Sequence, residues 1–291
     1  MRPMSGVPTR TLHDKLMAGL AASSRRDAAR FLPAGGTLDV DSFERRVLGA
    51  ERRLVRAGTV SGRQVAEPDA GQLVLLSCRN IDAYLVAIAT LWKRGFVPLL
   101  ADADLPREEI ARLVRVFRPG FCLFDRRVGP EGGETESLGD SLAGLHAWIP
   151  PRRDGTRLDG RPGAAIVRLT SGSTGRPRGI VVTADQLLAD AGQIARTVGI
   201  RPNDTLVTAI PLGHAFGFTH ILMMLVLQGT RPLLLEQPLP ALLVEALSSP
   251  GPLVMPATPY LFQLLLQSAG RKSFKGLRLC LSAGAPLPEE L

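Results

Sequence analysis

Short apolar segments alternate with amphipathic segments along most of the chain. The apolar runs predict strands at residues 73–77, 97–100, 121–124, 164–169, 205–209, 231–235, 253–255 and 277–282. Between them, apolar residues recur three or four positions apart, which predicts helices at 81–94, 106–117, 184–198, 218–228, 239–247 and 259–267. Strands that alternate with helices pair in parallel through right-handed crossovers. We therefore predict an α/β fold of layered, mostly parallel sheets with flanking helices.

Other stretches depart from this alternation. Residues 1–30 are polar and read as an irregular lead-in, followed by an amphipathic helix at 43–55 with an arginine-rich exposed face. Residues 126–163 are rich in Gly, Pro, Asp and Arg, which predicts a long surface excursion whose Trp148 folds back onto the core. The rest is expected to form two lobes, at about 31–198 and 199–291.

Composition indicates a folded protein and argues against a nucleic-acid partner. Hydrophobic residues make up 45% of the chain and charged residues 21%, enough apolar side chain to offset the entropy of ordering. The net charge of +8 is spread along the chain, and the 5% of aromatic residues are too few for base-stacking platforms. We therefore expect no nucleic-acid binding.

The cysteines and apolar runs favour a cytoplasmic location. Cys78, Cys122 and Cys280 lie far apart in predicted strands, which suggests buried, reduced thiols. The longest apolar stretch, Ile221 to Leu227, falls well short of the roughly 20 residues that cross a bilayer. We expect a cytoplasmic protein without a membrane span.

The segment from Thr170 to Gly179 reads Thr-Ser-Gly-Ser-Thr-Gly-Arg-Pro-Arg-Gly and follows a predicted strand. Its small and hydroxyl residues allow the backbone to fold closely around an anion, with N–H and O–H donors and arginine charge, as a triphosphate requires. It is not a Walker A loop, because Pro177 occupies the position of the second glycine. A plain turn is the alternative interpretation of such a loop.

This string resembles the phosphate loop of the adenylate-forming superfamily, which includes acyl-CoA synthetases, luciferases and nonribosomal peptide adenylation domains. The family pattern is Ser-Gly-(Ser/Thr)-Thr-Gly-x-Pro-Lys-Gly, and Arg178 replaces its lysine. The replacement keeps the charge but changes a compact ammonium into a planar fork. Residues 91–99, 211–218 and 281–287 resemble further family segments in order and spacing, so the resemblance covers about residues 35 to 291.

The resemblance implies roles for individual residues. It assigns the ATP phosphates to Thr170, Ser171, Gly172, Ser173, Thr174, Gly175 and Arg178, and the adenine to Gly284, Ala285 and Pro286. His214, Phe216 and Gly217 would line the pocket for the substrate carboxylate, with His214 as the candidate catalytic residue. A lone histidine is more often a cap or core residue, and the neighbouring glycines and aromatics favour the pocket. His220 has no metal-ligand spacing to His214 and is expected to be structural.

The resemblance also implies a reaction, the ATP-dependent activation of a carboxylic acid to an acyl adenylate. Magnesium would accompany ATP, and coenzyme A or the phosphopantetheine of an acyl carrier protein would accept the acyl group as a thioester. Family members that use amino acids place an aspartate beside the turn at 211–218, where this chain has no acidic residue. We therefore expect the substrate to be an acyl or aryl acid.

The superfamily elements that normally follow the adenine turn are not among the 291 residues. They include a Tyr-Gly-x-Thr-Glu segment, a ribose-binding aspartate and a small domain with a catalytic lysine. The resemblance therefore predicts two lobes of a truncated large N-terminal domain, inactive by itself. The alternative is a noncatalytic half-domain that binds a nucleotide or a partner protein.

Overall fold

The computed structural model describes residues 7–23, 28–33, 36–59, 71–127, 129–142, 144–151, 155–170, 176–270 and 272–289. The chain divides into two compact units. The first consists of residues 1–14, 42–79 and 83–187, and the second of residues 15–41, 80–82 and 188–291. The main segment of the second unit thus begins at 188, eleven residues before the expected start of the second lobe at 199, and that unit also includes two earlier stretches.

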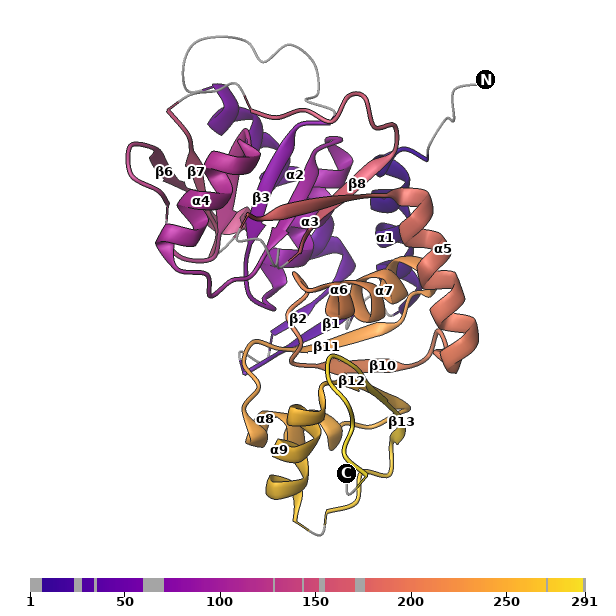
Figure 1. Ribbon diagram of the computed structural model, residues 1–291. Helices are drawn as coiled ribbons and strands as arrows, with labels where there is room; N and C mark the ends of the chain where they lie inside the picture. Colours follow the sequence, from indigo (N-terminus) through magenta and orange to yellow (C-terminus); the bar gives the residue numbers. More distant parts are fainter. Residues whose placement is uncertain are drawn as a thin grey trace. The chain divides into compact units, whose positions relative to one another are not determined.

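The first unit contains a seven-stranded sheet in the order β6-β7-β5-β3-β4-β8-β9, of which Figure 1 labels β6, β7, β3 and β8. Its central strands are parallel: β5 (Phe121–Phe124), β3 (Leu73–Ser77), β4 (Val97–Ala101) and β8 (Ala164–Thr170). β7 (His146–Ile149) and β9 (Arg178–Thr183) pair antiparallel with these strands, and β6 (Glu134–Ser137) pairs antiparallel with β7. β3 and β4 are buried along their whole length, as parallel strands are when both faces are covered.

Helices of the first unit follow the predicted apolar patterns. In α4 (Arg107–Phe117), Ile110 and Leu113 pack on the side chains of β3, β4 and β5. α3 (Asp82–Lys93) is buried from Ala83 to Trp92, consistent with a helix that is apolar on all sides. The amphipathic helix expected at 43–55 is present within α2 (Val40–Thr59).

Two predictions in the first unit need correction. The expected excursion at 126–163 contains β6 and β7, which extend the sheet, with the 3-10 helix η1 (Gly139–Leu142) between them. Trp148 does fold back onto the core, being 2% exposed, and its Nε1 donates to the Pro130 carbonyl at 3.1 Å. In addition, the Ser/Gly-rich loop lies between two strands, β8 and β9, because the chain returns along the sheet before α5 (Ala184–Ile194) begins.

The second unit contains a six-stranded sheet in the order β13-β12-β10-β11-β1-β2. All its strands run parallel except β2 (Gly36–Leu38). The others are β13 (Leu277–Ser282), β12 (Leu253–Ala257), β10 (Thr205–Thr208), β11 (Arg231–Leu235) and β1 (Ala29–Leu32). Its helical segments include α6 (Ala215–Gly217), α7 (Met223–Gln228), α8 (Pro240–Leu247), α9 (Pro259–Ala269) and the π-helical turns η2 (Ala195–Gly199) and η3 (Phe218–Leu222).

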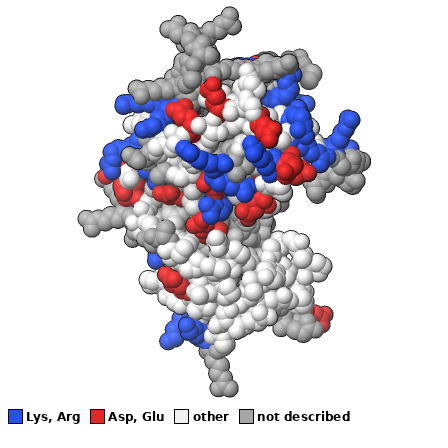
Figure 2. Space-filling model, turned by 90° about the vertical axis from the view of Figure 1, so that its left-hand side faces the viewer, with Lys and Arg blue, Asp and Glu red and all other residues white. Residues whose placement is uncertain are grey.

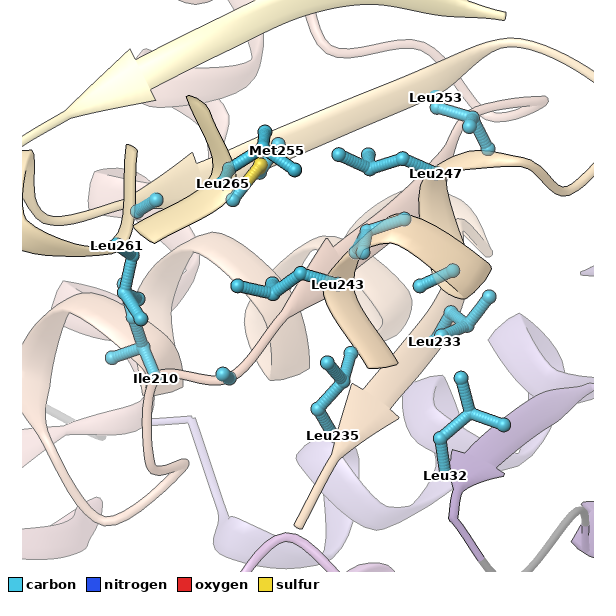
Figure 3. Packing of buried hydrophobic residues seen from close by; sticks show 14 of the residues in the cluster. Leu32, Ile210, Leu233, Leu235, Leu243, Leu247, Leu253, Met255, Leu261 and Leu265 are labelled. Carbon is cyan, nitrogen blue, oxygen red and sulfur yellow. The ribbon is translucent and has the colours of Figure 1, made fainter. Parts of the chain in front are cut away.

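A compact apolar core joins this sheet to α8 and α9. Figure 3 shows Leu243 and Leu247 of α8, with Leu261 and Leu265 of α9, packed around strand residues that include Met255. Most of these side chains are less than 7% exposed. The carboxyl ends of β10 and β12 are therefore fixed by the core beneath them.

The expected irregular lead-in at 1–30 is wrong in large part. α1 (Thr9–Ser23) buries Leu12, Leu16 and Leu20 completely, a four-residue spacing that places them on one helical face. β1 follows and pairs with β11, a contact between residues about 200 positions apart. The segment is polar on average, but its apolar residues are spaced for burial.

The distribution of surface charge and the burial of the cysteines can be compared with the expectations from the sequence. On the face seen in Figure 2, Lys and Arg side chains are mixed with Asp and Glu over the first unit, and the second unit shows broad uncharged areas. No helix within the described ranges is long and apolar enough to cross a membrane. Cys78 and Cys122 are buried reduced cysteines, as expected, whereas Cys280 is exposed because every second residue of β13 faces outward.

Candidate functional site

The β8–β9 hairpin carries the predicted phosphate loop in the first unit. Thr170, the last residue of β8, is the register partner of Arg178, the first residue of β9. The Thr170 hydroxyl lies 3.5 Å from the Arg178 carbonyl oxygen, and the Arg178 side chain is exposed. The other predicted phosphate ligands, Ser171 to Gly175, lie outside the described residues. The hairpin therefore fixes the two ends of the loop and leaves a cationic side chain in solvent.

In the second unit, the turn that follows β10 carries His214. The His214 N–H donates to the Pro211 carbonyl at 3.0 Å, and the His214 carbonyl accepts from the Phe218 N–H at 2.8 Å. His214 is exposed at the N-terminal cap of α6, and its side chain makes no capping hydrogen bond. A sealed-core position is thus excluded, and the role of His214 at a carboxylate stays a prediction.

Gly217 allows this turn to close tightly. A Cβ atom at Gly217 would lie 2.4 Å from the Pro211 carbonyl oxygen, closer than real Cβ contacts allow. The glycine is also buried, so there is no room for the clash to relax toward solvent. A side chain here would push apart the two ends of the turn that carries His214.

Phe216 is held by a residue that the sequence did not assign to the site. His220 lies edge-on to the Phe216 ring, with centroids 4.5 Å apart, and its Nδ1 is 3.2 Å from the Phe216 carbonyl oxygen. Because a carbonyl oxygen only accepts, Nδ1 carries the proton. Burial lowers the pKa of His220, although the Phe216 carbonyl and the Asp190 carboxylate oppose the shift. The structural role expected for His220 therefore includes orienting Phe216.

The predicted adenine turn follows β13. Gly284 has φ +93°, a backbone conformation that favours glycine, and the preceding Ala283 N–H donates to the Ala257 carbonyl at 3.2 Å. Ala285 and Pro286 are exposed. Behind the turn, β13 is anchored by Arg278, whose Nε donates to the buried Asp204 carboxylate at 2.8 Å and whose Nη2 also contacts Asp204.

The His214 turn and the Gly284 turn lie at the same edge of the six-stranded sheet. They follow β10 and β13, parallel strands separated only by β12, so their starting points are about 10 Å apart at the usual strand spacing. Open α/β sheets bind ligands at the carboxyl ends of their strands. Two of the segments singled out in the sequence are thus brought to one edge.

The sequence reasoning missed two buried polar residues near this edge, Asn80 and Thr208. Asn80 lies three residues after β3 ends, and its contacts with the distant turn leave no local signal in the sequence. For metals, no group of three or more His, Cys, Asp or Glu side chains that could hold an ion occurs in the described part of the chain. The described residues therefore offer no protein-built metal site.

Comparison with known proteins decides the family. The model of the family described as "AMP-binding enzyme" matches residues 68–291, which include both turns and the hairpin. The chain belongs to the AMP-binding enzyme family. The resemblance inferred from the motifs is thereby confirmed.

Curated relatives of this AMP-binding chain are named CoA ligases. It is 33% identical to benzoate–CoA ligase of Thauera aromatica over 68% of the chain and 41% of the relative. It is 24% identical to 2-succinylbenzoate–CoA ligase of Bacillus cytotoxicus over 76% of the chain and 45% of the relative. The chain thus spans less than half the length of these two proteins.

Solved structures confirm the fold of an AMP-binding enzyme. The o-succinylbenzoate CoA synthetase of Bacillus subtilis, solved with an acyl-adenylate intermediate, matches with TM-score 0.71 at 18% identity, over 94% of this chain and 68% of that one. MbtA of Mycobacterium smegmatis matches with TM-score 0.72 at 19% identity, over 95% of this chain and 52% of that one. The predicted α/β fold of an adenylate-forming N-terminal domain is correct.

Proposed function

We propose that the protein containing this chain activates a carboxylic acid with ATP. A carboxylate oxygen attacks the α-phosphorus, the bond from that phosphorus to the bridging oxygen breaks, pyrophosphate leaves, and an acyl adenylate forms. The observation that carries the proposal is the AMP-binding family match across residues 68–291, which includes the hairpin loop and both turns.

The protein's part in this reaction is to hold the reactants in line and to offset developing charge. Thr170, the loop from Ser171 to Gly175, and Arg178 would bind the β- and γ-phosphates. The backbone from Gly284 to Pro286 would border the adenine. His214, with Phe216 and Gly217, would shape the carboxylate end. Magnesium would enter as part of the ATP substrate, since the described residues supply no metal site of their own.

We further propose an aryl acid as the substrate and coenzyme A as the acceptor. The thiol sulfur would attack the adenylate carbonyl carbon, AMP would leave, and a thioester would form. The support is the 33% identity to a protein named benzoate–CoA ligase. The absence of an acidic side chain between Pro211 and Phe218 argues against an amino acid substrate, because family members that use amino acids place an aspartate there.

Acid-dependent exchange of labelled pyrophosphate into ATP tests the proposal. It should be measured on the product of the whole reading frame that contains these residues, with benzoate, 2-succinylbenzoate and octanoate. Exchange with an aryl acid, followed by thioester formation when coenzyme A is added, is the expected result. If a thioester forms only on a carrier protein, coenzyme A is the wrong acceptor. If the protein binds ATP but no acid supports pyrophosphate exchange, the proposed function is wrong.

Arg178→Ala, with Arg176→Ala as its matched control, tests the phosphate role. Both arginines are exposed, and only Pro177 separates them in sequence. Loss of a charge-assisted contact costs about 1.5 to 3 kcal/mol, so we expect kcat/KM for ATP to fall roughly tenfold to a hundredfold in Arg178→Ala alone. Equal values in the two variants would contradict the assignment.

A further inference from the structure

The turn that carries His214 is held by a buried side chain from a distant part of the sequence. Asn80, which is 3% exposed, belongs to the second unit although it follows β3 in the chain. Its Nδ2 donates to the Ile210 carbonyl at 2.9 Å and to the Leu235 carbonyl at 3.3 Å. Its Oδ1 accepts from the Leu212 N–H at 2.8 Å. One amide thus satisfies both donors and joins the turn to the end of β11.

Thr208, the last residue of β10, binds the N–H of the same residue, Ile210, whose carbonyl Asn80 binds. It is fully buried, and its hydroxyl accepts from the Ile210 N–H at 3.0 Å and donates to the Pro256 carbonyl at 3.2 Å. Pro211, which follows Ile210, has no backbone N–H and so needs no acceptor. The backbone groups of a turn outside any regular element are therefore matched by two side chains.

The side chains of the turn divide sharply between core and solvent. Ile210 is 6% exposed and belongs to the core shown in Figure 3, and Leu212 is fully buried. His214, two residues later, is exposed. The turn is fixed at Ile210 and Leu212, which bond to Asn80, and the exposed residues that follow are attached to this fixed backbone. Such support from a packed and hydrogen-bonded shell is what keeps a binding group within a fraction of an ångström of its working position.

We infer that Asn80 is a positioning residue for the acid-binding turn: it fixes the backbone that presents His214 and Phe216 to the carboxylate end of the substrate. This inference rests on the proposed function. Asn80 acts through the turn and does not itself touch the substrate. Its loss should therefore weaken binding of the acid more than binding of ATP, because Asn80 bonds to the His214 turn and to the end of β11. The proposed phosphate loop belongs to the other compact unit, and the proposed adenine turn follows a different strand, β13.

The test compares Asn80→Ala, Thr208→Val and Gln228→Ala with the unchanged protein in pyrophosphate exchange. Gln228 is the matched control, since its amide also donates to a backbone carbonyl of the second unit, that of Ile200, at 3.1 Å. We expect Asn80→Ala to raise KM for the acid about tenfold, as loss of a buried hydrogen bond does, and to change KM for ATP less than about twofold. Thr208→Val should shift the same constant by less, and Gln228→Ala should shift neither.

Hydrogen exchange of the Leu212 amide gives a readout that does not depend on activity. Asn80→Ala removes its acceptor, so its exchange should accelerate, and in Gln228→Ala it should not. If Asn80→Ala does not fold, Thr208→Val carries the kinetic test, because it removes one partner of the same turn. An equal rise in both KM values, or values matching Gln228→Ala, would overturn the positioning role alone. No exchange with any acid in the unchanged protein would overturn the proposed function and, with it, this role.

Discussion

Three histidines occupy positions where a positive charge is disfavoured. Burial lowers the pKa of His13, His146 and His220 below the ordinary value. For His13 the burial effect exceeds the opposing effects of the Ala89 carbonyl, 3.0 Å from its Nδ1, and of the Asp14 carboxylate. For His146 the nearby Arg127 adds to the lowering, and Asp125 opposes it. These imidazoles are neutral in the folded protein at pH 7.

Their protonation should destabilise the fold. Unfolding returns each pKa to about 6.5, so the unfolded chain binds more protons between that value and the lower folded pKa. The stabilising contribution is complete above about pH 6.5 and is lost as the pH falls below it. We expect the melting temperature to drop between pH 7.5 and pH 5.5, and to drop less in His13→Gln. An equal acid sensitivity in His13→Gln would show that His13 does not contribute.

For individual residues, the sequence was sufficient to single out candidate site residues but not to predict which residues contact one another. The motifs located Thr170, Arg178, His214 and Gly284, because small, hydroxyl and charged residues in a fixed order have a chemical meaning. Asn80 was not predicted, because its bonds to the turn join residues at least 130 positions apart, and such pairing leaves no local pattern. The phosphate, carboxylate and adenine roles of the motif residues stay predictions.

Among the elements, the strands with continuous apolar runs were predicted almost to the residue. β3, β5, β11 and β13 begin and end where the apolar runs do. The strands that were missed are short or polar: β6 is exposed at all four positions, and the first half of β9 is exposed. Edge strands bury one face at most, so the hydrophobic pattern that reveals central strands is weak in them.

The anchor of β13 gives a prediction at the level of an element. Asp204 is 1% exposed, so Arg278→Ala would leave a buried carboxylate without its charged partner. Breaking such a pair typically costs about 3 to 5 kcal/mol, and we expect a loss of about 3 kcal/mol in the free energy of unfolding by urea. The pKa of Arg278 is raised, chiefly by its hydrogen bond to Asp204, which agrees with a favourable pair.

Arg231→Ala is the matched control for this anchor. Arg231 begins β11 and donates through Nη2 to the Asn203 carbonyl at 3.1 Å, beside the same loop but without a carboxylate. Its removal should cost about 1 kcal/mol or less. Equal losses in the two variants would mean that the ion pair adds nothing to ordinary hydrogen bonding.

Across the whole molecule, the second unit is assembled from three separate stretches of chain. β1 comes from the first of these and lies between β11 and β2 in the sheet. A fragment of residues 188–291 would therefore expose the edge of β11 and lose the packing of Phe31 and Leu32, each 6% exposed in the whole chain.

We expect that fragment, expressed alone, to lack a cooperative thermal transition, whereas residues 1–291 should show one. Circular dichroism against temperature, with the full chain as control, makes the measurement. A sharp transition in the fragment would show that the strands from β10 onward form a stable sheet without β1.

The pairing of β1 with β11 also implies a delay during synthesis, because the two strands lie far apart in the chain. A ribosome makes β1 about 200 residues before its partner strand, which at about 5 to 20 residues per second leaves it waiting roughly 10 to 40 s. During that interval only β2 is available to pair with β1, and the other edge of β1 can pair with another nascent chain. A cell that makes this protein must keep the early strand apart from its copies until the later one emerges, so translation rate and chaperone supply will govern its yield.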